Sequence, residues 1–189
     1  MLRLERVSKI FPNSEVLKDV TWEVKPSDRI GLVGVNGAGK STQLRIIAGL
    51  EEVTSGKVVR QGDPRIAYLK QEFDVDPFRT VRDELFQAFS DAAAVLNELH
   101  RIQKEMDSIS GIKDDQYLNE LIRKLGVNQN RYEALNGYEL EAQIEKILPQ
   151  IGFTTKAGDQ LVGDFSGGWQ MRIALGKILL QEPDLILLD

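Results

Sequence analysis

The segment Gly34–Ser41 constrains the possible folds of this chain more than any other feature. It reads Gly-Val-Asn-Gly-Ala-Gly-Lys-Ser and fits the pattern G-x-x-x-x-G-K-[ST]. Glycines allow successive backbone N–H groups to turn inward around an anion, and a following helix adds the partial positive charge of its N-terminus. An apolar run at 29–34 precedes the loop, and a helical pattern at 40–50 follows it. The sequence therefore predicts a buried parallel strand, a phosphate-binding loop and a helix, in that order.

The residue types within this loop predict individual roles. Lys40 is expected to reach the β- and γ-phosphates of a nucleotide, and the Ser41 hydroxyl is expected to bind Mg²⁺. A glycine-rich turn that binds nothing is the alternative, but the predicted strand and helix on either side argue against it. The predicted phosphate-binding residues are Gly34, Asn36, Gly37, Ala38, Gly39, Lys40, Ser41 and Thr42.

Two weaker motifs lie near the C-terminal end of the sequence. The run Phe165-Ser166-Gly167-Gly168-Trp169-Gln170 opens a predicted helix, and by itself it is typical of an N-cap followed by flexible glycines. The run Asp184-Leu185-Ile186-Leu187-Leu188-Asp189 predicts a buried strand that ends in a carboxylate. An aspartate at such a position beside a phosphate-binding loop supports Mg²⁺. The order of the three motifs is more informative than any of them alone.

Short apolar runs predict further strands near 2–7, 16–24, 56–61 and 65–69. The second of these alternates, which places Val16, Val20, Trp22 and Val24 on one side.

A different pattern begins after Phe78 and indicates helices. Apolar residues at alternating spacings of four and three predict a heptad-like seam, with Gln103 as its polar break. The seam residues are Leu85, Phe89, Ala92, Leu96, Leu99 and Met106. Polar residues at 108–115 interrupt it, and a second helical pattern follows. We therefore predict a helical hairpin within an insertion, residues 80–137, while 1–79 and 138–189 form an α/β core.

Composition excludes several classes of function. The sequence has no cysteine, so disulfides and thiolate metal sites are excluded. It lacks the roughly 18 consecutive apolar residues that a membrane span needs. The net charge is −5, with the acidic excess in the middle of the chain, which argues against a nucleic-acid footprint. We expect a soluble chain with neither membrane nor DNA as a partner.

The ordered motifs resemble those of the ATP-binding cassette superfamily, with Ser166–Gln170 as the signature motif and Asp189 as the Walker B aspartate. This resemblance implies a P-loop NTPase core with an antiparallel β subdomain, and ATP and Mg²⁺ as cofactors. It also implies that Ser166, Gly167 and Gly168 cap a nucleotide held by a second cassette.

The same resemblance suggests roles for two residues that carry no signal alone. Gln71 matches the glutamine that contacts Mg²⁺ and the attacking water. The resemblance thus implies three metal contacts, Ser41, Gln71 and Asp189. It also implies two catalytic residues, Gln71 and Asp189. Phe11 stands where the family places an aromatic ring that stacks on adenine, although it is equally typical of a core aromatic.

Narrower features resemble the ABC-F branch, in cyanobacterial and plastid forms. These are Trp169 and Arg172 in the signature and the hairpin, which matches the arm inserted into the first cassette. The resemblance implies an ATPase with two cassettes on one chain that acts on the ribosome, in the cytoplasm or the plastid stroma. The alternatives are the nucleotide-binding subunit of a membrane transporter, which the insertion does not suit, and a DNA-repair cassette, whose coiled-coil insertions are much longer.

The sequence stops at Asp189, before the family's catalytic glutamate and switch histidine. The resemblance therefore implies a truncated cassette that binds nucleotide and turns it over little or not at all.

Overall fold

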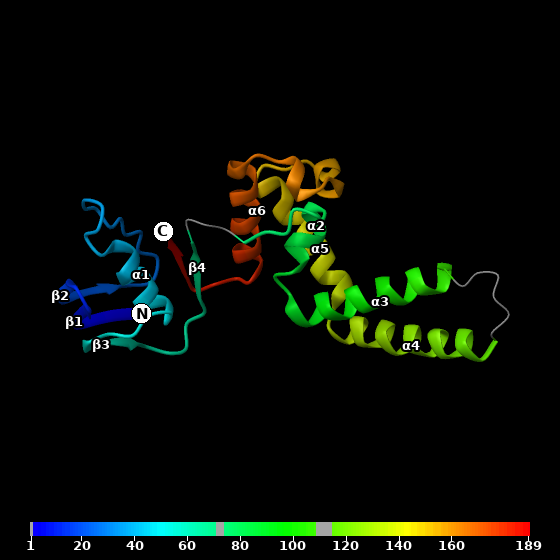
Figure 1. Cartoon of the computed structure of the whole chain (residues 1–189), viewed down its shortest axis with the longest axis horizontal. Coiled ribbons are helices and arrows are strands. Elements are labelled where there is room, and N and C mark those ends of the chain that lie inside the picture. The colour runs from blue at the N-terminus through cyan, green and yellow to red at the C-terminus, as the bar shows by residue number, and fades with distance from the viewer. Residues whose placement is uncertain (1, 71–73, 109–114) are drawn as a thin grey trace. The chain divides into compact units, whose positions relative to one another are not determined.

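The computed structural model describes residues 2–70, 74–108 and 115–189, and the chain divides into two compact units (Figure 1). One unit contains residues 1–73 and 182–189, and it combines strands with a helix. The other contains residues 74–181 and is helical. The predicted α/β class is confirmed.

The first unit contains a three-stranded antiparallel sheet. Its strands are β1 (Leu2–Phe11), β2 (Ser14–Val24) and β3 (Ser55–Arg60), in the order β2-β1-β3. All three follow the predicted runs, and the predicted antiparallel β subdomain is confirmed.

The predicted core side of β2 is confirmed, because Val16, Val20, Trp22 and Val24 pack against the core of this unit, but bulges interrupt the alternation. The pairing of β1 with β2 shifts register between Leu4 and Val7, and Arg6 and Asp19 have φ angles of 47° and 46°. A bulge changes which side chains face the core beyond it. Leu17, on the parity predicted to face solvent, is therefore buried with 3% exposure.

A second, parallel sheet joins two distant segments of the chain. Strands β4 (Ile66–Leu69) and β5 (Leu185–Leu188) pair in register, and the Asp189 amide donates to the Leu69 carbonyl. Helix α1 (Lys40–Ala48) packs its apolar side into the core of this unit. The buried residues of that core are Leu2, Leu4, Val7, Leu17, Ile46, Ile47 and Leu187.

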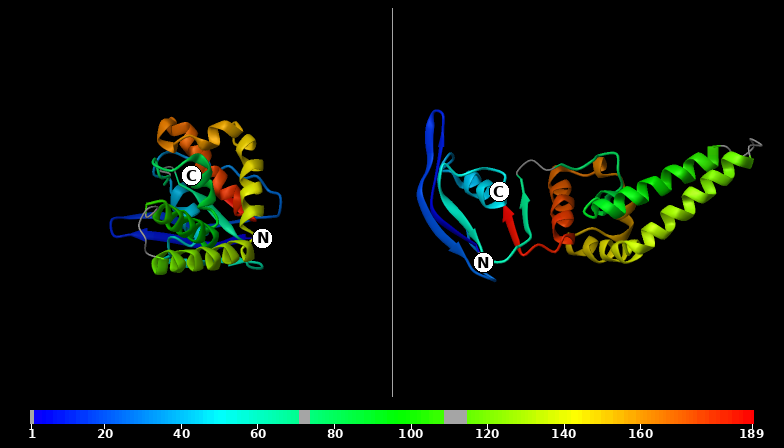
Figure 2. Two further views of the ribbon diagram at one scale, coloured as in Figure 1. Left: turned by 90° about the vertical axis from the view of Figure 1, so that its right-hand side faces the viewer. Right: turned by 90° about the horizontal axis from the view of Figure 1, so that it is seen from below.

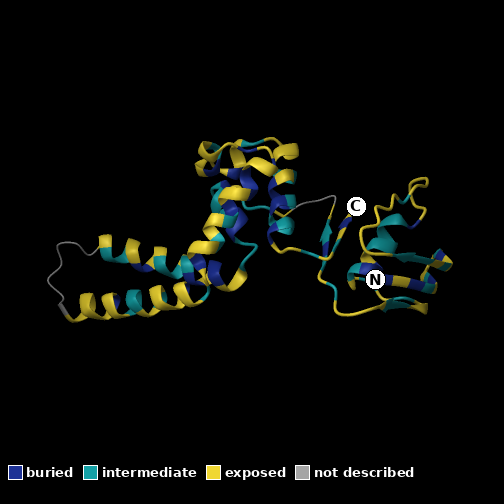
Figure 3. Ribbon diagram, turned by 180° about the vertical axis from the view of Figure 1, so that it is seen from behind, coloured by how far each residue is buried: buried dark blue, intermediate teal, exposed yellow. Residues whose placement is uncertain are grey.

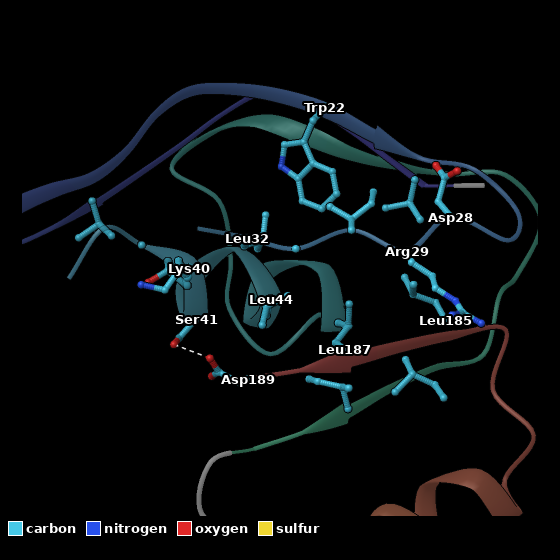
Figure 4. Close-up of a pocket in the computed structure, with 18 of the residues that line it drawn as sticks. Trp22, Asp28, Arg29, Leu32, Lys40, Ser41, Leu44, Leu185, Leu187 and Asp189 are labelled. Atoms are coloured by element: carbon cyan, nitrogen blue, oxygen red, sulfur yellow. Dashed lines mark hydrogen bonds between the residues drawn. The ribbon is translucent and has the colours of Figure 1, made fainter. Parts of the chain in front are cut away.

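The buried strand predicted at 29–34 is wrong. Among the described residues no strand pairs with this segment, and Ile30 and Val33 are exposed. A parallel strand persists only where a neighbour satisfies its backbone hydrogen bonds. Here residues of the segment and of β5 line a common cavity, and no hydrogen-bonded ladder connects the two (Figure 4).

The helical unit has its own core, to which three helices, two short 3₁₀ helices and the hairpin all contribute. Outside the hairpin, these elements are α2 (Val81–Phe86), α5 (Gly137–Gln150), α6 (Gly167–Leu180), η1 (Thr155–Asp159) and η2 (Val162–Asp164). Fully buried core residues include Val81, Leu85, Leu148, Val162 and Ile173. The helix predicted to begin at the Phe165–Gln170 run is confirmed as α6.

Helices α3 (Ser90–Ser108) and α4 (Asp115–Ala134) form the predicted hairpin, and they lie side by side in Figures 1 and 2. Most of α4 is exposed, as Figure 3 shows. Residues 138–181 belong to the same compact unit as the hairpin.

The predicted seam of the hairpin is confirmed in part. Leu85 and Ala92 are buried, and Phe89, Leu96 and Leu99 pack against the same core. Helix α2 ends at Phe86 and α3 begins at Ser90, so no single helix carries the predicted pattern. Within α3 the buried side includes Val95 and Ile102, whereas Leu96 is only partly buried. Positions three and four apart are both neighbours on a helix. Ile102 is fully buried and Gln103 is exposed, so Ile102 occupies the buried side where the seam predicted Gln103.

A buried charge ties two helices of this unit together. Glu84 of α2 is 1% exposed and accepts from Lys177 of α6 and, at 3.3 Å, from Arg79. A buried carboxylate needs such partners, because it loses its hydration on burial.

In the described part of the chain, no helix is both long and apolar enough to cross a membrane.

Candidate nucleotide-binding site

A cavity of about 980 Å³ opens in the first unit, between β2, α1 and β5 (Figure 4). Its polar end is formed by the predicted phosphate-binding loop and the start of α1, and its other walls are largely apolar. The residues that line it are Val16, Trp22, Val24, Asp28, Arg29, Ile30, Gly31, Leu32, Asn36, Gly37, Gly39, Lys40, Ser41, Thr42, Leu44 and Leu185–Asp189.

The loop conformation requires glycine at its last turn. Gly39 has φ 84°, and a Cβ atom there would lie 2.6 Å from Leu17 Cδ2 and 3.0 Å from the Val16 carbonyl oxygen. Gly37 also has a positive φ, 83°. Gly39 caps α1 without a side-chain hydrogen bond, so the amides of the first turn keep their capacity to bind an anion.

Lys40 is held over the loop that precedes it. Its ammonium group donates to the carbonyl oxygens of Gly34 and Val35, at 2.8 and 3.0 Å. Because these are neutral acceptors at an exposed site, phosphate oxygens can replace them with stronger, charge-assisted hydrogen bonds.

The fold brings Ser41 and Asp189 together from positions 148 residues apart. The Ser41 hydroxyl donates to Asp189 Oδ1 at 2.7 Å, and Figure 4 shows this contact at the carboxyl end of β5. Mg²⁺ prefers hydroxyl, carboxylate and phosphate oxygens, usually with only one or two protein carboxylates. Ser41 and Asp189, two of the three side chains predicted to bind the metal, therefore form a donor set that fits it.

The sequence did not reveal Tyr68, which belongs to the same cluster. Its phenol donates to the other carboxylate oxygen, Asp189 Oδ2, at 2.6 Å. Partial burial and this hydrogen bond to Asp189 raise the pKa of Tyr68, and Arg45 opposes the increase. The only available signal was the position of Tyr68 in a predicted strand, which does not identify its neighbour.

The other predicted site residues differ in their placement. Asn36, Gly37 and Thr42 line the cavity, whereas Gly34 and Ala38 lie against each other in the loop. Gln71 lies outside the described residues. Phe11 is not among the residues that line the cavity; it is 36% exposed, and Lys9 Nζ lies 5.0 Å from the centroid of its ring.

The motif Ser166–Gly168 begins α6 in the helical unit. Ser166 is the N-cap, and its carbonyl oxygen accepts from the amides of Trp169 and Gln170. Ser166, Gly167 and Gly168 are exposed, and a Cβ atom at Gly168 would meet nothing within 4 Å. The motif is therefore a second open helix N-terminus able to bind an anion.

The two tryptophans have different surroundings. Trp169 packs edge-to-face on Phe153, with ring centroids 4.9 Å apart, and Arg172 lies 4.3 Å from the centroid of its indole. Trp22 lines the cavity of the first unit and donates from Nε1 to the Gln43 side chain at 3.0 Å.

Comparisons with known proteins agree with this geometry. The family model described as ABC transporter matches residues 17–189. ABC transporter F family member 5 of Arabidopsis thaliana is 47% identical over 190 residues, covering all of this chain and 27% of that protein. The energy-dependent translational throttle protein EttA of Escherichia coli K12 is 34% identical, covering 98% of this chain and 32% of that protein.

The fold itself is similar to that of a dimeric ATP-binding cassette solved in a post-hydrolysis state with ADP and Pi. The TM-score is 0.63 at 20% identity, covering all of this chain and 73% of that one. The chain thus spans about a third or less of the length of the two curated relatives. Its similarity to ABC transporter F family member 5 is consistent with a cassette of the F subfamily. On the family match, the chain belongs to the ABC transporter family.

Proposed function

We propose that this chain binds Mg-ATP at the cavity of its first unit and works as a cassette of an ATPase. The observation that carries the proposal is the contact between Ser41 and Asp189 beside the phosphate-binding loop, since it assembles an oxygen donor set next to anion-binding amides. The family to which the chain belongs consists of ATPases, which supports hydrolysis as the reaction.

Each group at the polar end of the cavity then has a distinct task. The loop amides and the N-terminus of α1 cradle the phosphates, and Lys40 exchanges its carbonyl partners for phosphate oxygens. Ser41 and Asp189 hold Mg²⁺, which neutralises charge on the phosphoryl group that is transferred. We assign Gln71 to the metal and the attacking water, and the exposed ring of Phe11 to adenine, as proposals that rest on resemblance.

The metal assignment predicts that Asp189→Asn removes most of the benefit of Mg²⁺ for ATP binding. The substitution keeps the size of the side chain but removes the charge that attracts the cation. We expect the ratio of ATP affinities with Mg²⁺ and with EDTA to fall about tenfold. Equilibrium titration with a fluorescent ATP analogue measures both affinities.

The matched control for this experiment is Asp184→Asn, at the other end of β5, where the carboxylate interacts with Arg65. This variant should keep the wild-type ratio. An unchanged ratio in Asp189→Asn would contradict the metal assignment.

The surroundings of the two tryptophans predict which one reports on nucleotide. A Trp169→Phe variant, which retains Trp22 in the cavity wall, should change its fluorescence when ATP is added. A Trp22→Phe variant, which retains Trp169, should not respond while the protein is monomeric, because Trp169 is packed on Phe153 and Arg172 in the other unit. A large response from Trp169 in the monomer would contradict this assignment.

We further propose that hydrolysis requires a second cassette, whose nucleotide is capped by Ser166, Gly167 and Gly168. The open start of α6 supports this role, and so does the dimeric state of the structurally similar cassette. Phosphate release should then rise faster than linearly with protein concentration. A specific activity that does not depend on concentration would count against the second cassette.

The resemblance to EttA and the α3–α4 hairpin support a role in translation, and we propose that the hairpin contacts the ribosome. This work would take place in the cytoplasm or, in a plant, in the plastid stroma. Sedimentation with ribosomes provides the test, with ATP and with the Lys40→Ala variant as the nucleotide control. If the amount of protein that sediments with ribosomes is the same with and without ATP, and the same in Lys40→Ala and the wild type, an ATP-driven translation factor is contradicted.

A further inference from the structure

We propose that Tyr68 is a positioning residue of the Mg²⁺ site, where its phenol holds the Asp189 carboxylate in the orientation that presents one oxygen to Ser41 and the metal. This inference rests on the proposed function, because it concerns the same site. It assigns a task to a side chain that does not itself touch the metal.

The two oxygens of Asp189 have different partners. Oδ1 accepts from the Ser41 hydroxyl at 2.7 Å, and Oδ2 accepts from the Tyr68 phenol at 2.6 Å. The Asp189 amide is also fixed, since it donates to the carbonyl of Leu69 at 3.1 Å. Strand β4 therefore holds Asp189 at two points, through its backbone and through the phenol, and leaves Oδ1 on the side of the phosphate-binding loop.

Helix α1 completes the arrangement from the other side. Arg45, four residues after Ser41 on the same helix, acts on the Tyr68 phenol as a nearby cation that opposes the increase in its pKa. Residues four apart lie on one side of a helix. Helix α1 thus supplies both the metal-binding hydroxyl and a cation near the phenol that holds Asp189.

The chemical consequence concerns the free rotation of a carboxylate. When both oxygens are equivalent and mobile, ordering one of them toward a cation costs conformational entropy. A hydrogen bond to one oxygen removes part of that cost before the metal arrives and fixes the direction of the other oxygen. Such outer partners of metal ligands typically change metal affinity or activity by 10- to 100-fold when they are removed.

A purely structural role for the phenol makes a different prediction. Tyr68 is half-buried, and its ring packs against the core of the first unit. If the hydroxyl only stabilised the pairing of β4 with β5, its removal would weaken nucleotide binding equally with and without the metal. The dependence on Mg²⁺ therefore separates positioning from stability.

The test uses the whole chain and the Tyr68→Phe variant, which removes the hydroxyl and keeps the ring. Affinity for a fluorescent ATP analogue is measured with Mg²⁺ and with EDTA for the wild type, Tyr68→Phe, Asp189→Asn and the double variant. Tyr138→Phe is the matched control, because it removes an exposed phenol from the helical unit. Thermal melting of each variant verifies the fold.

We expect Tyr68→Phe to lower the ratio of the Mg²⁺ and EDTA affinities about tenfold, with the EDTA affinity unchanged. The double variant should show no further loss beyond Asp189→Asn, because the phenol acts only through that carboxylate. A wild-type ratio in Tyr68→Phe, equal losses in both conditions, or an additive double variant would overturn the proposal. If the wild-type chain itself binds no ATP, the proposed function fails instead.

Discussion

Lys40→Ala is expected to weaken ATP binding by roughly 10- to 100-fold while leaving the melting temperature nearly unchanged. Hydrogen bonds to charged groups contribute about 1.5–3 kcal/mol each, which corresponds to this range of affinity. Among the described residues, the ammonium group donates to two loop carbonyls, which are neutral, so its removal leaves no buried charge unpaired. Binding and stability therefore depend on this side chain to very different extents.

Nucleotide titration and thermal melting of the same preparations measure the two effects. Lys18→Ala is the matched control, because Lys18 is an exposed lysine on β2 outside the cavity lining. It should change neither quantity. ATP affinity that is the same in Lys40→Ala and the wild type would refute the phosphate assignment, whatever the melting temperature.

Gly137→Ala is expected to destabilise the helical unit by about 2–3 kcal/mol and to lower its melting temperature by about 8–20 °C. A Cβ atom at Gly137 would lie 2.3 Å from Cζ of Tyr132. The Tyr132 ring cannot easily give way, because it is 3% exposed, packs against Phe86 and Tyr138, and donates to Glu141 at 2.6 Å. Alanine gains at most about 1 kcal/mol of helix propensity over glycine, so the steric conflict is the larger effect.

Gly126→Ala provides the opposite result in a neighbouring helix. Gly126 lies within α4, and a Cβ atom there would meet nothing within 4 Å. This variant should be more stable by about 0.5–1 kcal/mol, because alanine restricts the unfolded chain and favours the helix. Circular dichroism at the helical signal follows both variants. Equal changes in stability from the two substitutions would show that contact with the Tyr132 ring is not the reason why a Cβ atom at position 137 is unfavourable.

Much of the site could be predicted from the sequence because its signals are local. The glycines of Gly34–Ser41 set a backbone path that only glycine adopts readily, and Gly37 and Gly39 do have positive φ angles. The helix after this loop, the hairpin and the apolar run that ends at Asp189 follow from periodicities within single segments. Ordered spacing between motifs then identified the family.

Tertiary structure decided the features that depend on a partner elsewhere in the chain. Residues 29–34 have the composition of a buried strand but no ladder partner among the described residues, and a strand needs that partner. In α3, steps of three and four residues both keep a side chain on one face, and only packing selected Ile102 over Gln103. Tyr68 reaches Asp189 across 121 positions because β4 and β5 pair in parallel. A local pattern specifies the backbone of its own segment, but a side-chain contact also depends on the segment that folds beside it.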